Sequence, residues 1–377
     1  MRKKTFGRMI SQVKQATSLV AVVLLIAGCA TPGSSAKTSP SAHASSSSPG
    51  SSPSPTSSGP ASPAPLTGVF ALLSTTTSAD NYTVSIVGID GKVVASTQAS
   101  SPIAVTCADA AAAVVPYPVS TSNDRAYYMD AQGVVRFLTV QGDTGRATTV
   151  PIGGGRRSTF AVSPDDQRIA VVVSDFTSAG VALKLYLEDL NGGTNHVDIF
   201  NSSGATGLWP VGWHGANLVV AKVPACASGG GPFCCGPSEL HVVDPTTAER
   251  RFTVGNATCV ITGAPSPAGA VCEDTKASQD VVLDWTGASS RTFPVPGPMA
   301  AYLSPDGRFV ALVSGTGTSV TGTNKTLQMQ ACGWIDSNHL IAGSDSQVQT
   351  RVGDLATGKV VPVAVQGACA GRLPGGL

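Results

Sequence analysis

From residue 67 onward, short apolar and β-branched runs alternate with clusters of Gly, Pro, Asp and Asn, without the 3.6-residue period of an amphipathic helix. Three segments read as a strand, a tight turn and a second strand: YTVSIVGIDGKVVAS from Tyr82, RAYYMDAQGVVRFLTV from Arg125 and LKLYLEDLNGGTNHVDIF from Leu183. Their turn sequences are Asp-Gly, Gln-Gly and Asn-Gly-Gly, which tight hairpins favour because they need positive φ angles. The pattern predicts an all-β domain over residues 67–377.

A repeated unit runs through this β-rich region. The segments FAVSPDDQRIAVVVS at 160–174 and AYLSPDGRFVALVSG at 301–315 share an apolar strand, a Ser-Pro-Asp turn and a second apolar strand. Proline presets φ at the second turn position, so this motif predicts a structural connection between two strands rather than a functional site. The units lie roughly 30 to 55 residues apart, close to the period of about 40 to 50 in four-stranded propeller blades. Weaker copies begin at Ser120, Val211, Ser266 and Gly333.

The strand, Ser-Pro-Asp-Gly, strand unit resembles the TolB-like and WD40-like β-propeller repeats of exported bacterial proteins, although no unit carries the Trp-Asp ending of WD40 repeats. The resemblance implies a single monomeric propeller. Six units and a preceding strand near residues 69–73 favour seven blades, while the short spacing of the last units leaves six open. Residues 68–99 look like three strands, so we expect the C-terminal strand to close the ring by pairing with the first blade.

The beginning of the chain has the pattern of an export signal. Five basic residues and no acid precede an almost wholly apolar run over residues 16–28. The run ends in Ile-Ala-Gly-Cys at 26–29, which resembles the bacterial lipobox, and an ordinary secretory signal is the alternative. The resemblance implies cleavage after Gly28 and fatty acylation of Cys29, including palmitate. Two or more acyl chains would anchor the protein firmly at the extracytoplasmic face of the cell membrane.

Residues 29–66 consist almost entirely of Ser, Pro, Ala, Thr and Gly. Such a segment buries too little apolar surface to offset its ordering entropy, so we expect a disordered tether between the lipid and the propeller. The whole chain has a formal net charge of +1, and removal of the signal leaves about −4. A weakly acidic domain lacks the basic surface that nucleic acid requires, and we expect no nucleic-acid binding.

The exported part contains eight cysteines besides Cys29, and an even number outside the cytosol favours disulfides. In CVITGAPSPAGAVC the Pro/Gly-rich centre predicts a hairpin that places Cys259 opposite Cys272 for a bridge. A bond between Cys332 and Cys369 would attach the C-terminal strand. A zinc site is the alternative for the CASGGGPFCC cluster with His241, but its spacing is unusual and an oxidising compartment favours bridges. The remaining disulfide candidates are Cys107, Cys226, Cys234 and Cys235.

No HExxH, Walker or Gly-x-Ser-x-Gly motif occurs in the sequence, and we predict neither a catalytic residue, a metal nor a cofactor. Propellers bind ligands where inner strands and loops meet around the channel. Aromatic residues there serve binding or packing between blades. The pattern GGGRR at a blade junction predicts a solvated loop with two exposed arginines, and a site for a carboxylate or phosphate is the alternative. The candidates are Trp209, Trp213, His214, Tyr302, Trp334, Arg156 and Arg157.

These features favour a membrane-anchored extracytoplasmic lipoprotein that acts as a binding or scaffold module for an envelope protein or a small ligand. The alternative is a propeller-type hydrolase or lyase with acidic residues from different blades at the channel mouth. Such residues would lie far apart in the chain, so their arrangement is a question for the structure.

Overall fold

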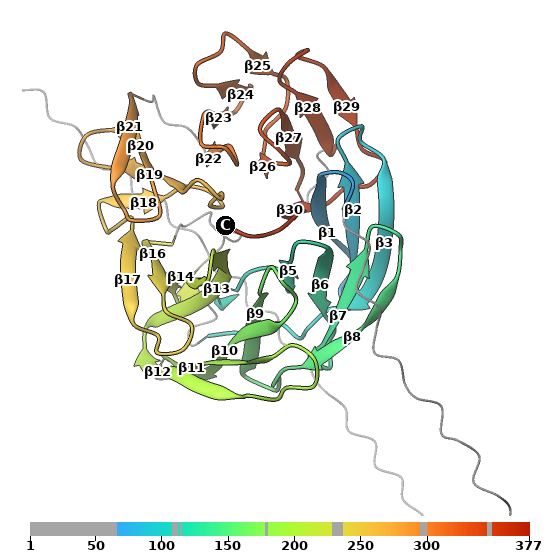
Figure 1. Cartoon of the computed structure of the whole chain (residues 1–377), viewed down its shortest axis with the longest axis vertical. Coiled ribbons are helices and arrows are strands. Elements are labelled where there is room, and N and C mark those ends of the chain that lie inside the picture. Colours follow the sequence, from blue (N-terminus) through green and yellow to red (C-terminus); the bar gives the residue numbers. More distant parts are fainter. Residues whose placement is uncertain are drawn as a thin grey trace, which may run out of the picture. The chain divides into compact units, whose positions relative to one another are not determined.

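The computed structural model describes residues 66–107, 112–113, 115–177, 180–227, 237–294, 300–344 and 349–377. Seven four-stranded antiparallel sheets stand in a ring (Figure 1), so this part of the chain is a seven-bladed β-propeller. The predicted fold class is confirmed, with seven blades rather than six. The described ranges contain no helix, and therefore none that is long and apolar enough to cross a membrane. The predicted signal and tether, apart from residue 66, lie outside them.

The blades follow one another along the chain, and each is built outward from a strand beside the central axis. From the inner to the outer strand, blade 1 contains β30 (Ala368–Leu373), β1 (Phe70–Ser78), β2 (Asn81–Gly88) and β3 (Val93–Ser100). Blade 2 contains β5 (Val119–Thr121), β6 (Arg125–Met129), β7 (Val134–Thr139) and β8 (Thr144–Thr149). Blade 3 contains β9 (Arg156–Val162), β10 (Arg168–Thr177), β11 (Gly180–Asp189) and β12 (Val197–Gly204). Blade 4 contains β13 (Thr206–His214), β14 (Asn217–Pro224), β16 (Glu239–Val243) and β17 (Arg250–Val254).

The last three blades have shorter strands, which explains the short spacing of their sequence units. Blade 5 contains β18 (Cys259–Ile261), β19 (Ala270–Asp274), β20 (Gln279–Leu283) and β21 (Ser289–Pro294). Blade 6 contains β22 (Ala300–Leu303), β23 (Val310–Ser314), β24 (Gly317–Val320) and β25 (Thr326–Leu327). Blade 7 contains β26 (Gly333–Trp334), β27 (His339–Ala342), β28 (Arg351–Asp354) and β29 (Val360–Pro362). A further small sheet pairs β4 (Ala112–Ala113) with β15 (Cys226–Ala227).

The ring closes through blade 1, as the sequence predicted. Strand β30, from the C-terminal end, pairs antiparallel with β1, from the beginning of the domain, and the two are in register from Phe70 opposite Leu373 to Ser74 opposite Ala368. A bulge interrupts this register between Leu72 and Leu73. Because the first and last strands share one sheet, the blade with three N-terminal strands is completed and the ring has no open edge there.

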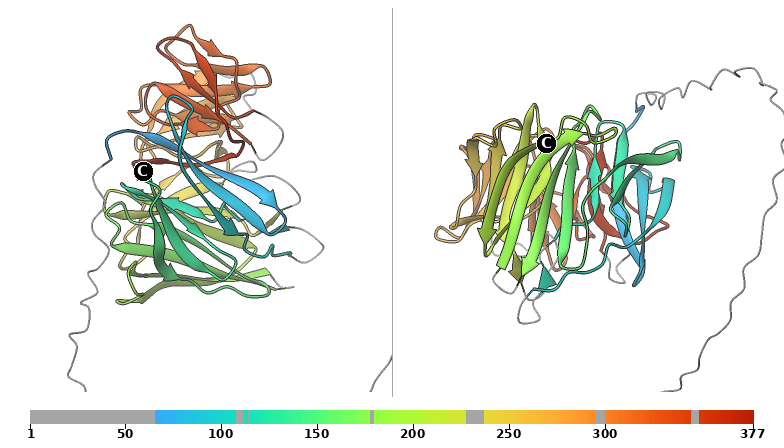
Figure 2. Two further views of the ribbon diagram at one scale, coloured as in Figure 1. Left: turned by 90° about the vertical axis from the view of Figure 1, so that its right-hand side faces the viewer. Right: turned by 90° about the horizontal axis from the view of Figure 1, so that it is seen from below.

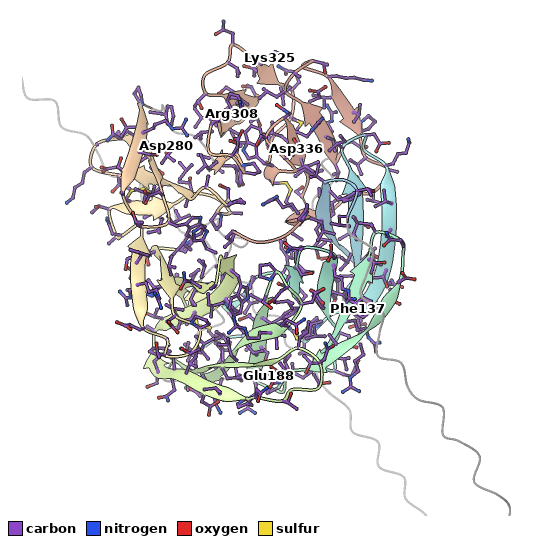
Figure 3. All side chains as sticks on the ribbon, viewed as in Figure 1. Phe137, Glu188, Asp280, Arg308, Lys325 and Asp336 are labelled. Carbon is purple, nitrogen blue, oxygen red and sulfur yellow. A yellow bond between two sulfur atoms is a disulfide. The ribbon has the colours of Figure 1, made fainter. Side chains whose placement is uncertain are left out.

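The hydrophobic core consists of seven apolar layers, one between each pair of neighbouring blades. Successive side chains of a strand point to opposite faces of its sheet, so a buried strand serves two layers. In β14, Val219 and Ala221 pack toward blade 5, whereas Leu218 and Val220 pack toward blade 3. Side chains fill the spaces between the sheets (Figure 3). This two-sided burial explains the continuous apolar runs in the sequence.

The Ser-Pro-Asp motifs form the turn between the two inner strands of a blade. In blade 6, Ser304 accepts a backbone bond from Gly307 N at 2.9 Å, and its hydroxyl oxygen accepts one from Phe309 N at 3.0 Å. In blade 3, Ser163 makes the matching bonds with Asp166 N at 3.0 Å and Arg168 N at 2.9 Å. Both serine hydroxyl groups form their hydrogen bonds within the turn, which confirms the structural interpretation of the motif.

Candidate functional site

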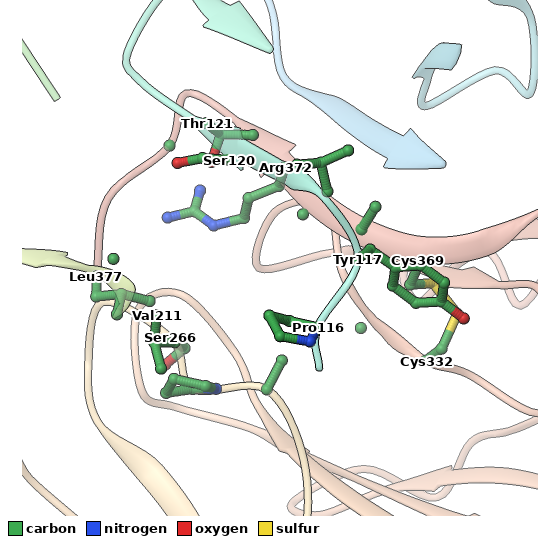
Figure 4. A pocket seen from close by; sticks show the side chains of 18 of the residues that line it. Pro116, Tyr117, Ser120, Thr121, Val211, Ser266, Cys332, Cys369, Arg372 and Leu377 are labelled. Atoms are coloured by element: carbon green, nitrogen blue, oxygen red, sulfur yellow. A yellow bond between two sulfur atoms is a disulfide. The ribbon is translucent and has the colours of Figure 1, made fainter. Parts of the chain in front are cut away.

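A cavity of about 420 Å³ lies at the centre of the ring (Figure 4). The inner strands of the blades converge there, so residues that are hundreds of positions apart in the chain share one wall. Every blade contributes, through its innermost strand or the turn that follows it. One lining residue from each of blades 1 to 7, in that order, is Arg372, Thr121, Phe160, Val211, Ser266, Tyr302 and Trp334.

Arg372 carries the one charged side chain among the described residues that line this cavity. Strand β30 carries it, and its guanidinium extends into the cavity (Figure 4). One guanidinium nitrogen lies 3.5 Å from Gly376 O, at the limit of a hydrogen bond, and no carboxylate of the described residues pairs with it within 4.0 Å. Burial lowers the pKa of Arg372 and the charge of Asp336 opposes that shift, but a guanidinium keeps its proton at neutral pH. Among the described residues that line the cavity, none is Asp, Glu, His or Lys.

The walls are otherwise apolar and aromatic, with a few hydroxyl groups. Trp334 donates a hydrogen bond from Nε1 to Tyr302 O at 2.9 Å, which joins blades 7 and 6 at the wall. Burial raises the pKa of the Tyr302 phenol. Ser120 Oγ accepts a bond from Val162 N at 3.0 Å, and Ser266 Oγ donates to Ser304 O at 3.3 Å. Both serines therefore also fasten one blade to the next.

The C-terminal tail, residues 374–377, crosses one end of the cavity. Gly375 N donates to Ser122 O in the inner turn of blade 2, and Leu377 N donates to Trp213 O in blade 4, both at 2.7 Å. His214 Nδ1 lies 2.8 Å from Leu377 O. The end of the chain thus lies at the middle of the ring in Figure 1 and at one face of the ring in Figure 2. Gly375, Gly376 and Leu377 line the cavity, so the tail forms part of its wall on the face of the inner turns.

Three disulfides occur in the described residues. The bond between Cys332 and Cys369 joins the beginning of blade 7 to β30, as the sequence suggested, and both cysteines line the cavity. The bond between Cys107 and Cys226 ties the segment after blade 1 to blade 4, across 119 residues of sequence. Cys226 is therefore no thiolate for the zinc site considered above, while Cys234 and Cys235 lie outside the described residues. No group of three or more His, Cys, Asp or Glu that could hold a metal occurs in the described ranges.

The Cys259–Cys272 bond is present, but the geometry predicted for it is wrong. Cys259 lies opposite Asp274 in the β18–β19 register, and Cys272 lies opposite Ile261. The bridge is therefore diagonal, across a Cα separation of 5.1 Å. A direct and a diagonal pair could not be distinguished from the sequence, because the eight residues between the two strands contain a further bridge, between Ser266 and Gly269, in a different register.

The structure brings three of the sequence candidates to the cavity, namely Trp209, Tyr302 and Trp334. Trp213 does not line the cavity and packs between blades 3 and 4, where Nε1 donates to Ala161 O at 3.3 Å. His214 stacks on Trp285 at 5.0 Å and holds the tail. Trp209, Tyr302 and Trp334 also pack in the layers between blades, so aromatic residues at the cavity wall serve both roles.

The expectation of two exposed arginines at this blade junction is wrong for Arg157 and right for Arg156. Arg156 and Arg157 begin strand β9, so they point to opposite sides of its sheet. Arg156 forms an ion pair with Asp175, with Nε 2.6 Å from Oδ1, whereas Arg157 is buried and donates to Ile103 O at 3.3 Å. The two side chains therefore form no common anion site. The arginine of the cavity, Arg372, was missed, and its one signal was a charge in the otherwise small and apolar strand ACAGRL.

No protein-family model matches the sequence, and no curated protein is similar to it. Solved structures with a similar fold include a mitotic checkpoint complex chain, at 11% identity and a TM-score of 0.43, over 70% of this chain and 83% of that one. A putative TolB from Agrobacterium tumefaciens matches at 14% identity and 0.39, over 74% and 86%. A puromycin-hydrolysing peptidase of Mycobacterium tuberculosis matches at 14% and 0.40, over 78% and 53%. Scores this low carry no argument about function.

Proposed function

We propose that this protein is an exported, lipid-anchored binding protein whose propeller takes up a small envelope ligand in its central cavity. The cavity is the observation that carries the proposal. Its volume of about 420 Å³ falls within the range of roughly 300 to 1,000 Å³ that is typical of ligand sites. Its apolar and aromatic walls with a few polar groups also have the usual composition of such sites.

The described lining of the cavity has the chemistry of a binding site. General acid–base catalysis needs a titratable group close to the reacting atoms, such as a carboxylate or an imidazole. The side chains of the described lining include neither of these two groups and offer one guanidinium, two phenols, other hydroxyl groups and aromatic faces. Such groups orient and desolvate a ligand, and their presence supports the proposed binding role.

Export and anchoring are supported by separate features. The basic and apolar beginning of the chain, Cys29 and the Ser/Pro/Ala-rich segment after it form the lipoprotein pattern described above. Three disulfides in the described residues agree with an oxidising compartment. A tethered propeller on the outer face of the membrane would meet its ligand in the envelope.

Native mass spectrometry of protein isolated from its own host tests the binding function. We expect the wild type to carry a bound mass that Val211→Phe loses, because Val211 stands on the cavity wall (Figure 4) and the larger ring would fill the space. Val197→Phe is the matched control, since Val197 is exposed on the outer strand β12. A bare polypeptide mass for the wild type, or steady turnover of glycosidase, esterase or lyase substrates, would argue against the proposal.

The anchor is tested independently in cells. We expect the wild type to sediment with membranes and to enter the detergent phase, and Cys29→Ala to lose both properties because it has no thiol for acylation. Crosslinking in living cells before the pull-down would identify any envelope partner that depends on the anchor. Equal partition of the two forms would contradict lipid anchoring without affecting the cavity.

A further inference from the structure

Among the arginines of the described residues, Arg372 is the one that lines the central cavity, and no carboxylate of these residues lies within 4.0 Å of it. It is partly buried on β30, the one hydrogen bond of its guanidinium is the long bond to Gly376 O, and Asp336 acts on it only through its charge, without an ion pair. A charge withdrawn from water without a partner costs free energy, and a bound anion would offset that cost. Five other arginines of the described residues have aspartate partners: Arg125, Arg136, Arg156, Arg251 and Arg308.

The position of Arg372 suits a ligand better than a structural contact. Its side chain projects into the cavity between the wall that carries Ser120 and Thr121 and the end of the tail at Leu377 (Figure 4). Ser120 Oγ accepts from Val162 N, so its hydroxyl hydrogen remains as a donor on the same wall. A guanidinium offers paired N–H donors that match the two oxygens of a carboxylate or phosphate.

The rest of the cavity wall indicates the chemical character of the uncharged part of a ligand. Pro116, Val211, Tyr302 and Trp334 present apolar or aromatic surface around the same space. Apolar burial stabilises a complex in proportion to the area removed from water. The described lining contains no further cation to pair with a second anionic group of a ligand. Desolvation of such a group would therefore reduce the affinity.

We infer that the central cavity selects small molecules that carry a single anionic group on an apolar body, with Arg372 holding the anion and the aromatic wall holding the body. This inference rests on the proposed binding function and names the ligand class of that same cavity. A carboxylate and a phosphate monoester share the chemistry that the guanidinium recognises.

Titration calorimetry at low ionic strength with benzoate, phenyl phosphate and benzamide tests the inference. The three probes share one ring, and benzamide lacks the charge. We expect at least one anion to bind ten-fold or more tightly than benzamide, and the tighter of the two anions assigns the acid group. Ligand-detected NMR extends the measurement to weak binding. Equal binding of benzamide, or no binding of any probe, would overturn the inference.

Variants of Arg372 connect the preference to this side chain. We expect Arg372→Gln to reduce the preference for the anion to less than two-fold, and Arg372→Lys to keep a weakened preference because it retains the charge. Arg157→Gln is the matched control, since Arg157 is another buried arginine outside the cavity, and it should bind as the wild type does. If Arg372→Gln unfolds, the Arg372→Lys result decides alone, and an unchanged affinity there contradicts bidentate recognition.

The outcome is distinguishable from failure of the proposed function. If the host-derived protein carries a neutral bound ligand and Val211→Phe loses it, the binding function holds and the anion selectivity fails. If no ligand is bound and no probe binds, both fail.

Discussion

Leu373, the last residue of β30, lies opposite Phe70, the first residue of β1, so the end of the domain completes the sheet that its beginning starts. The same strand carries Cys369 and Arg372, and the tail that follows it crosses the cavity. The pairing of β30 with β1 therefore closes the ring and also positions Cys369 and Arg372 in the candidate site. Loss of β30 would remove the inner wall of blade 1 as well as the closing strand.

The three disulfides should differ in their contribution to stability. A bridge restricts the unfolded chain more when it closes a longer loop, and the sequence separations are 119, 37 and 13 residues. We expect replacement of both cysteines by alanine to cost about 5, 4 and 3 kcal/mol for Cys107–Cys226, Cys332–Cys369 and Cys259–Cys272 respectively. Urea unfolding of the three double variants measures the order, and a largest loss for the 13-residue pair would contradict it.

We expect one methyl group added at Gly375 to displace the C-terminal tail. An alanine Cβ at Gly375 would lie 2.6 Å from Ser122 O and 2.7 Å from Thr121 O, which are backbone atoms that cannot move aside. We expect Gly375→Ala to break the bond between Gly375 N and Ser122 O, to cost about 1 kcal/mol, and to expose the tail. Faster proteolysis of the last residues under native conditions measures the exposure.

Gly154→Ala is the control for this experiment. No atom lies within 4 Å of the position that its Cβ would occupy, and Gly154 needs no unusual φ angle. We expect its stability and its proteolysis rate to equal those of the wild type. Equal tail proteolysis in Gly375→Ala and the wild type would show that the tail tolerates the clash and does not depend on this contact.

The Ser-Pro-Asp turn offers a test that separates stability from binding. Ser304 is completely buried, and its hydroxyl accepts from Phe309 N and donates to Asp306 Oδ1 at 2.7 Å. We expect Ser304→Ala to cost about 1 to 3 kcal/mol because Phe309 N loses its partner. Ser314→Ala, at an exposed position of the same blade, should change stability by less than about 0.5 kcal/mol. Both variants should bind cavity ligands normally, and selective loss of binding in Ser304→Ala would give the motif a functional role.

The propeller could be predicted because its signals are local and repeated. A Ser-Pro-Asp turn between two apolar runs needs only a few neighbouring residues, and its recurrence reveals the blade period. The three-stranded look of residues 68–99 even indicated which strand was missing. The closure of the ring by the C-terminal strand could therefore be predicted from the strand missing in the first blade, because a four-stranded blade with three consecutive strands must take its fourth strand from elsewhere in the chain.

The site could not be predicted to the same extent. Whether an inner-strand side chain faces the cavity or a neighbouring blade depends on twist, bulges and register, which no short segment encodes. Trp209 lines the cavity and packs toward blade 5, while Trp213, on the same strand, packs toward blade 3 and does not reach the cavity, with a register shift between Pro210 and Gly212. Arg372 was missed for the same reason, because its orientation follows from pairing with a strand 300 residues away.

Asp280 should make stability depend on pH in an unusual direction. It lies in β20 (Figure 3), it is completely buried, and neither carboxylate oxygen has a hydrogen-bond partner in the described residues. Burial, and then the charge of Glu273, raise its pKa to about 6. The folded state therefore holds a proton that the unfolded state releases near pH 4, so stability falls as the pH rises from about 4 to 6 and stays low above that.

Asp280→Asn should remove this dependence, because the amide cannot ionise. We expect it to gain about 1 to 3 kcal/mol at pH 7.5 and little at pH 4, measured by urea unfolding across the pH range. Asp284, in the turn after β20, is the matched control because its pKa is shifted in the opposite direction. A hydrogen bond from the Thr286 hydroxyl lowers this pKa, as do the bonds that the carboxylate accepts from Thr286 N at 2.8 Å and Ala288 N at 3.0 Å. Asp284→Asn should therefore lose stability at pH 7.5 and lose less as the pH falls below 4. A destabilised Asp280→Asn at pH 7.5 would mean that the buried carboxylate is compensated in the folded state.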